Sequence, residues 1–151
     1  MSLVDDIIDY TARTEGGGRY DAWNPEDHGA GVSFGLIQFN QKVGTLPSLF
    51  VAMRSRNRSL FDQHFGEYAD SFVDERWVRT SNLVGLRDLI TSSGRMPDFQ
   101  QAQRDVAKSI YWTQAERLAK QYGIKSQRGL AMVFDSYVQR SPSKVAAAMA
   151  A

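Results

Sequence analysis

The sequence predicts a mainly α-helical domain with one small β-hairpin near its amino terminus. Apolar residues recur at helical spacing over residues 3–15 and again over residues 98–122. Between these stretches, residues 19–34 combine aromatic side chains with Asn24-Pro25 and Gly29-Ala30-Gly31, a pattern typical of a short hairpin or irregular ribbon. A length of 151 residues with 42% hydrophobic and 11% aromatic content predicts one ordered domain over residues 1–151.

The first helix is expected over residues 3–15, where apolar positions alternate with Asp5, Asp6 and Asp9. Gly16 to Gly18 are expected to end it, because glycine adopts the left-handed conformation that a helix C-terminus needs. Ser33 is expected to cap a second helix that begins near Gly35.

Further helices are expected after Gly44-Thr45-Leu46-Pro47 and in several short segments. They cover residues 48–54, 59–68, 74–78 and 83–91. The longest helix is predicted over residues 98–122, with Gly123 at its end, and Gln100, Gln101, Gln103 and Gln114 are expected to face water. Ser126 is expected to cap a final buried helix that Arg140-Ser141-Pro142 closes, before a short helix in the alanine-rich tail.

Composition excludes several classes of function. The chain has no cysteine and only two histidines, so we expect neither a metal site nor a cofactor. A net charge of +1 gives no general attraction to nucleic acid. The basic run over residues 54–58 is interpreted as a solvated helix end, with nucleic-acid binding as an alternative.

Targeting signals are also not expected. The segment MSLVDDIIDY has acids where a secretory signal needs positive charge, and no apolar stretch reaches the length of a membrane span. We therefore expect no signal peptide and no membrane insertion.

Glu15 is the principal candidate for acid catalysis. At the C-terminal end of its helix, unpaired carbonyls disfavour a carboxylate by about 0.3 to 1 kcal/mol. Burial beside Tyr20, Trp23 or Phe34 would raise its pKa further, whereas pairing with Arg13 would lower it. A glutamate exposed at a frayed helix end is the alternative interpretation.

A second carboxylate is expected in the hairpin, because enzymes that cleave glycosidic bonds use a general acid that faces a second carboxylate. Asp21, Glu26 and Asp27 compete for this role, and Asp27 lies nearest the glycines. Asp135 lies on an otherwise apolar helix and is interpreted as half of a structural ion pair with Arg104 or Arg13. Side chains with flat apolar faces or hydrogen-bonding groups suited to sugars complete the expected substrate site: Tyr20, Trp23, Asn24, Ser33, Gln38 and Asn40.

The order of these segments resembles the lysozyme superfamily. Goose-type lysozymes and lytic transglycosylases carry a segment similar to Ser33-Phe34-Gly35-Leu36-Ile37-Gln38 after their catalytic glutamate. More specifically, EGGGRYDAWNPEDHGAGVSFGLIQFNQKVGTLPSLF, with FQQAQRDVAKSIYW and GLAMVFDSYVQ, resembles lysozyme-like domains of bacterial and phage peptidoglycan-targeting proteins, which are related to the family 46 chitosanases. The resemblance spans roughly residues 5–145.

The resemblance implies a lysozyme-like (α+β) fold with Glu15 as general acid. In the chitosanases a hairpin acid activates water, and a threonine in the position of Ser33 helps to hold that water. Here His28 stands opposite the expected aspartate, with Asp27 one place away. The resemblance leaves two readings open: Asp27 takes the role, or the enzyme works with one carboxylate. It also implies an acid-base network around Asp135.

The sequence therefore predicts a glycoside hydrolase of muramidase type that cleaves the β-1,4 glycan strand of peptidoglycan. Glu15 and Asp27 are the expected catalytic residues. Peptidoglycan is preferred to chitosan because it is anionic and the chain carries no excess of acids. The alternatives are a lytic transglycosylase, a chitosanase and an inactive glycan-binding module. The chain is expected to be made in the cytoplasm and to reach the wall through a holin, a secretion system or phage delivery, as a module of a larger phage or secreted protein.

Overall fold

The computed structural model describes residues 2–139 and 148–150, and within them helices surround a small sheet. The amino-terminal elements are α1 (Leu3–Glu15), β1 (Trp23–Asn24), β2 (Ser33–Phe34) and β3 (Phe39–Asn40). The middle of the chain forms α2 (Thr45–Arg56), α3 (Arg58–Phe65), η1 (Gly66–Tyr68), α4 (Ala69–Phe72), α5 (Glu75–Thr80), η2 (Leu83–Leu86) and α6 (Arg87–Ser93). The last elements are α7 (Pro97–Ala107), η3 (Lys108–Trp112), α8 (Thr113–Gln121) and α9 (Gln127–Gln139).

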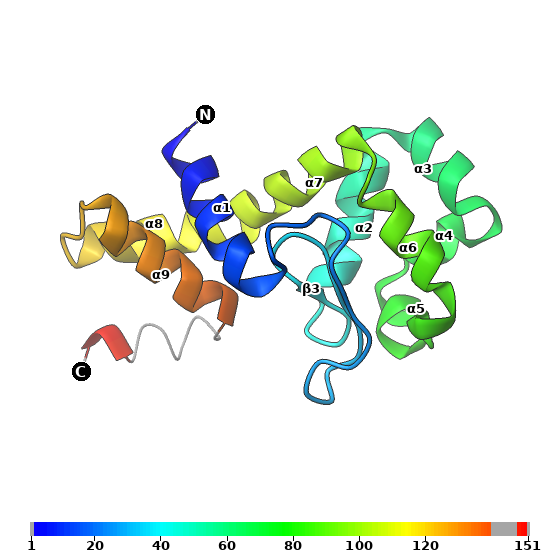
Figure 1. Ribbon diagram of the computed structural model, residues 1–151, viewed down its shortest axis with the longest axis horizontal. Helices are drawn as coiled ribbons and strands as arrows, with labels where there is room; N and C mark the ends of the chain where they lie inside the picture. The colour runs from blue at the N-terminus through cyan, green and yellow to red at the C-terminus, as the bar shows by residue number, and fades with distance from the viewer. Residues whose placement is uncertain (1, 140–147, 151) are drawn as a thin grey trace.

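The helices form two groups with the sheet region between them. Figure 1 shows α1, α8 and α9 together on one side, α2 to α6 on the other, and α7 running from one group to the other. Helix α7 packs on α2, and α9 packs on both α1 and α8. This arrangement brings the end of α1, the sheet loops and the end of α9 close to one another.

The first helix has the predicted bounds, and its ends follow from local chemistry. The Ser2 side chain accepts a 3.2 Å hydrogen bond from the Asp5 N–H. At the other end, the N–H groups of Gly16 and Gly18 both donate to the Ala12 carbonyl, each at 2.9 Å. Gly18 has a φ of 77°, which a side chain would make unfavourable. Glu15 is therefore held at the last position of a firmly terminated helix.

The predicted hairpin is present, and a third strand extends it into an antiparallel sheet of order β1-β2-β3. Ser33 lies opposite Asn24 on one side and Asn40 on the other. The prediction of a second helix that begins near Gly35 is wrong. Gly35 and Gln38 have φ values of 93° and 56°, so the chain turns tightly between β2 and β3 instead of continuing as a helix.

The core of the second group is aromatic. Phe50 and Phe65 both pack against Phe72, with ring centroids 4.7 Å apart in each pair, and Phe61 packs on Phe65 at 4.5 Å. All four rings are almost completely buried. Burial of each contributes about 1.5 to 3 kcal/mol relative to exposure, which stabilises this group of helices.

The predicted long helix is continuous from Pro97 to Gln121, but η3 is a π-helical turn that the apolar spacing did not predict. Gly123 ends the run with a φ of 69°. The Ser126 hydroxyl caps α9 as expected by accepting a 3.1 Å bond from Gly129 N–H. The predicted helix end at Arg140-Ser141-Pro142 lies outside the described residues, while residues 148–150 are helical.

Candidate functional site

A cleft of about 530 Å³ lies where the two groups of helices meet the sheet loops. Its walls come from the end of α1, the β1–β2 loop, the start of α2, η3 and the end of α9. Titratable and amide side chains line it, including Glu15, Asp27, His28, Gln38, Asn40 and Tyr111. The cleft therefore brings together four of the residues predicted for the site: Glu15, Asp27, Gln38 and Asn40.

Glu15 is half-buried in this cleft, and its pKa is raised above the usual value of a glutamate. Burial is the largest cause, and the negative charges of Asp135 and Asp27 act in the same direction, while the amide of Gln139 opposes them. Among the described residues, no ion pair joins Arg13 to Glu15. A carboxyl group with this environment retains its proton to a higher pH than an exposed one, as a general acid requires.

Asp27 is the hairpin acid that reaches the cleft. Its Oδ2 accepts a 2.6 Å hydrogen bond from the hydroxyl of Ser33, which is buried in β2 and accepts a 3.0 Å bond from Nδ2 of Asn40. The backbone of Asp27 also bonds within its own loop, to Gly31 and Ala30. The carboxylate is thus fixed by both its side chain and its main chain.

The other two candidates for the second carboxylate have different partners. Asp21 forms ion pairs with Arg19 at 3.1 Å and Arg95 at 3.2 Å, and these lower its pKa despite the opposing effect of burial. Glu26 is exposed and accepts a 2.7 Å bond from the N–H of Gly29. Neither lines the cleft, so the geometry favours Asp27 over both.

The prediction that Asp135 forms an ion pair with Arg104 or Arg13 is wrong. Arg104 instead bonds to Asp9, Asp5 and the Tyr20 hydroxyl, and within the described part of the chain Asp135 forms no ion pair. Its Oδ2 accepts a 3.1 Å bond from Gln139, and its Oδ1 is buried without a hydrogen-bond partner there. Asp135 thus acts on Glu15 as an uncompensated negative charge from α9.

Four of the predicted substrate-binding residues do not line the cleft: Tyr20, Trp23, Asn24 and Ser33. The Tyr20 hydroxyl accepts a 2.6 Å bond from Nε of Arg104, whose guanidinium lies over the Tyr20 ring. Trp23 packs against the core, and Asn24 accepts a bond from the N–H of Glu26 in a local turn. Their role as substrate contacts stays a prediction, while the structure gives Tyr20 a clear structural contact.

Ser33, Gln38 and Asn40 have local hydrogen-bond partners as well. The Gln38 amide donates to the Gly35 carbonyl at 3.2 Å, and Asn40 Oδ1 accepts from the N–H groups of Lys42 and Val43. Ser33 lies behind the cleft wall, bonded to Asp27. These side chains hold the cleft in shape; their contact with substrate stays a prediction.

Two buried glutamines position the loops of the site. Gln103, expected to face water, is fully buried: its Oε1 accepts from Leu36 N–H at 2.7 Å and its amide donates to the Tyr20 carbonyl at 2.9 Å. Gln41 in the same way connects Val32 to the carbonyls of Val78 and Ser81. Gln103 follows Phe99 by four residues, and this helical spacing could have indicated an inward position.

The basic run of α2 and α3 is neutralised by aspartates. Arg54 pairs with Asp62 and Asp70, and Arg56 approaches Asp98 and Asp105. These ion pairs account for the basic run without a nucleic-acid partner, because the arginine charges that could bind phosphate are already paired with aspartates.

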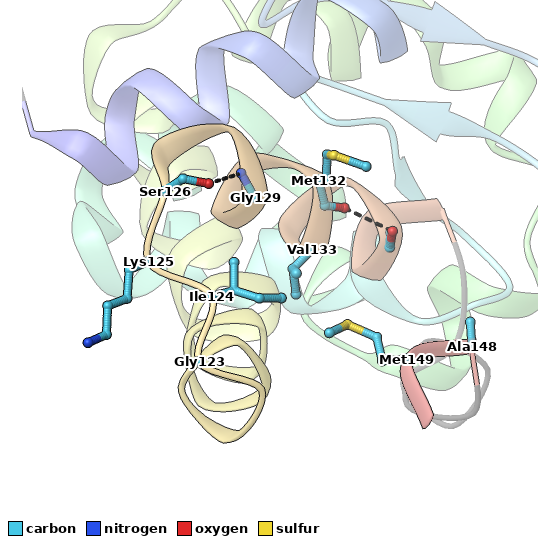
Figure 2. A pocket seen from close by; sticks show the side chains of 10 residues that line it. Gly123, Ile124, Lys125, Ser126, Gly129, Met132, Val133, Ala148 and Met149 are labelled. Carbon is cyan, nitrogen blue, oxygen red and sulfur yellow. Dashed lines mark hydrogen bonds between the residues drawn. The ribbon is translucent and has the colours of Figure 1, made fainter. Parts of the chain in front are cut away.

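A larger cavity of about 610 Å³ lies between the end of α8 and α9 (Figure 2), away from these groups. Its lining is mainly apolar, with Ile124, Met132, Val133 and Met149 around it and Lys125 as its charged residue among those described. The described lining of this cavity includes no carboxylate and no histidine, so the smaller cleft is the better candidate for chemistry.

The described residues also contain no cluster of acids and histidines that could hold a metal ion, and no helix with the length and apolar character of a membrane span.

Comparison with known proteins supports the fold. No protein-family model and no curated protein matches the sequence. Among solved structures, the chain is similar to a GH46 chitosanase from Gynuella sunshinyii in complex with chitotetraose, with a TM-score of 0.65 and 23% sequence identity. The match covers 91% of this chain and 57% of the chitosanase, so this chain spans little more than half of that protein's length. The fold is therefore lysozyme-like and mainly α-helical, with one small antiparallel sheet.

Proposed function

We propose that this chain is a glycoside hydrolase that cleaves the β-1,4 glycan strand of peptidoglycan, with Glu15 as its general acid. The observation that carries the proposal is the half-buried Glu15 carboxyl, whose pKa is raised first by burial and then by Asp135 and Asp27. The lysozyme-like fold and a structural neighbour that binds a chitooligosaccharide are consistent with a glycan substrate.

In the proposed mechanism, Glu15 donates its proton to the glycosidic oxygen as the bond from that oxygen to the anomeric carbon breaks. A water molecule attacks the anomeric carbon from the opposite face of the sugar, and Asp27 takes a proton from it. Glu15 then regains a proton from solvent and Asp27 releases the proton that it took from water, so both carboxyl groups return to their starting states. The hydrogen bond from Ser33 supports this role, because it fixes the Asp27 carboxylate before substrate arrives.

Peptidoglycan is the proposed substrate because the chain has no overall excess of acids and this polymer is anionic. Chitosan is a second candidate, favoured by one local observation. The described lining of the cleft carries Glu15, Asp27 and His28 but no lysine or arginine side chain, and such a lining attracts a cationic glycan.

Digestion of purified peptidoglycan and of chitosan, followed by mass analysis of the products, tests the proposal. We expect fragments with reducing ends from peptidoglycan. Anhydro ends would instead identify a lytic transglycosylase, and cleavage of chitosan alone would identify a chitosanase. Binding without any product would identify an inactive glycan-binding module. Release of the inverted anomer is expected if Asp27 activates water across a gap of about 6.5 to 9.5 Å, and retention if the gap is about 5 to 5.5 Å.

The route by which the protein reaches the cell wall is a separate proposal. Delivery by a holin, a secretion system or a phage particle is tested by following the protein in its natural host, with and without each system, and measuring lysis.

A further inference from the structure

The long helix between the two groups contains one irregular turn, and that turn faces the cleft. In η3 the N–H of Thr113 bonds to the Lys108 carbonyl, five residues earlier. The Thr113 hydroxyl donates to the same carbonyl at 3.2 Å, and the Gln114 amide donates to the Ile110 carbonyl at 2.9 Å. A π-helical turn shifts the phase of the side chains around it, and such turns occur frequently at functional sites.

Tyr111 lies within this turn and lines the cleft together with Glu15. Its ring packs edge-on against the fully buried Phe134, with centroids 6.3 Å apart and an interplanar angle of 81°. The ring is therefore anchored against the core, and Tyr111 is at the same time one of the residues that line the cleft with Glu15. Neither the catalytic steps above nor the fold requires the Tyr111 hydroxyl.

Thr45, at the start of α2, lines the cleft together with Tyr111. The Asn40 N–H donates to the Thr45 hydroxyl at 2.7 Å, so that hydroxyl already has a donor to its oxygen. The neutral phenol of Tyr111 carries a proton that it can donate to a group bound in the cleft.

The electrostatic environment keeps that donor protonated. Burial raises the pKa of Tyr111 above its usual value, Thr45 opposes this, and the negative charge of Glu15 adds to the increase. The phenol is therefore a neutral donor throughout the range in which Glu15 can act as an acid.

We propose that Tyr111 is a substrate-contacting residue whose phenol donates a hydrogen bond to an oxygen of the sugar bound against Glu15. The inference rests on the proposed glycan-cleaving function and adds a binding group from η3 to it. Loss of one neutral hydrogen bond to the glycan weakens binding about 2- to 10-fold.

The binding test uses Glu15→Gln protein, so that the sugar is not consumed. Calorimetry with chitotetraose and with a tetrasaccharide from the peptidoglycan strand compares three proteins: Glu15→Gln alone, with Tyr111→Phe and with Tyr68→Phe. Tyr68 is a matched control, because it is also partly buried and packs edge-on against a phenylalanine, Phe72, but outside the cleft. We expect weaker binding only with Tyr111→Phe, with thermal stability kept because the ring remains.

A second measurement requires no sugar. Titration of the Tyr111 ¹³Cζ signal by NMR is expected to give a lower Tyr111 pKa in Glu15→Gln than in wild type, because the negative charge of Glu15 is removed. Equal binding by the Tyr111→Phe and Tyr68→Phe proteins overturns the inference while leaving the proposed function in place. A Tyr111 pKa that does not respond to Glu15→Gln also overturns it. Absence of binding to both sugars by Glu15→Gln alone overturns the proposed function, and the inference with it.

Discussion

The hydroxyl of Ser33 donates a 2.6 Å hydrogen bond to Oδ2 of Asp27. Ser33 lies in the central strand β2, fully buried, and its own oxygen accepts a bond from Asn40 in β3. The small sheet therefore does more than cover the core: through two side chains it sets the orientation of a carboxylate that lines the same cleft as Glu15.

Removal of this hydroxyl should impair catalysis more than binding. In Ser33→Ala, Asp27 loses its donor and Asn40 loses its acceptor, so we expect kcat to fall about 10- to 100-fold with little change in KM. The unfolding free energy should fall by about 1 to 3 kcal/mol, because a buried amide is left unsatisfied. Ser33→Thr keeps the hydroxyl and should retain most of the activity. An unchanged kcat in Ser33→Ala would show that the orientation of Asp27 is irrelevant.

Asp135 should set the upper pH limit of activity. Its negative charge favours the neutral form of Glu15, so Asp135→Asn should lower the Glu15 pKa. Since the acid must be protonated to act, the basic limb of the pH profile of kcat should move to lower pH. The ¹³C NMR titration of Glu15 measures the same shift directly, and Asp105→Asn, outside the cleft, is the control. A basic limb that stays in place, or moves upward, contradicts this role.

The Tyr20 hydroxyl should stabilise the fold through its contact with Arg104. Its hydroxyl accepts a charge-assisted bond from Arg104, which also pairs with Asp5 and Asp9 of α1. Tyr20→Phe should lower the unfolding free energy by about 1 to 3 kcal/mol in chemical denaturation. Binding of chitotetraose should remain as in wild type. A large loss of affinity with unchanged stability would instead show that the Tyr20 hydroxyl contacts the substrate.

Features that depend on local chemistry could be predicted from the sequence. The bounds of α1 follow from apolar spacing and the glycines after Glu15, and the cap of α9 follows from Ser126. The turn at Gly35 could not be predicted in this way. Ser33 is a good helix cap in isolation, but its hydroxyl is bound to Asp27 in the folded chain, and β2 pairs with β3 instead.

Features that depend on contacts between distant residues were predicted less well. The sequence singled out Glu15 and Asp27 and gave the correct kind of fold, but the partners of Arg104 lie 84 to 99 residues earlier and leave no local signal. The same holds for Gln103, whose amide connects two loops of the sheet region. Tyr111 was missed because the π-helical turn that contains it interrupts the helical spacing used to predict the long helix.

The most direct test of the account is the rate of product release from peptidoglycan, with chitosan measured in parallel, by wild type, Glu15→Gln and Glu67→Gln. Glutamine keeps the size of the side chain but has no acidic proton, so the account predicts a loss of about 10²- to 10⁴-fold in Glu15→Gln with the fold unchanged. Glu67 is an exposed glutamate in η1, and its variant should retain the wild-type rate. Equal release of products by wild type and Glu15→Gln would contradict the assignment of Glu15 as the general acid.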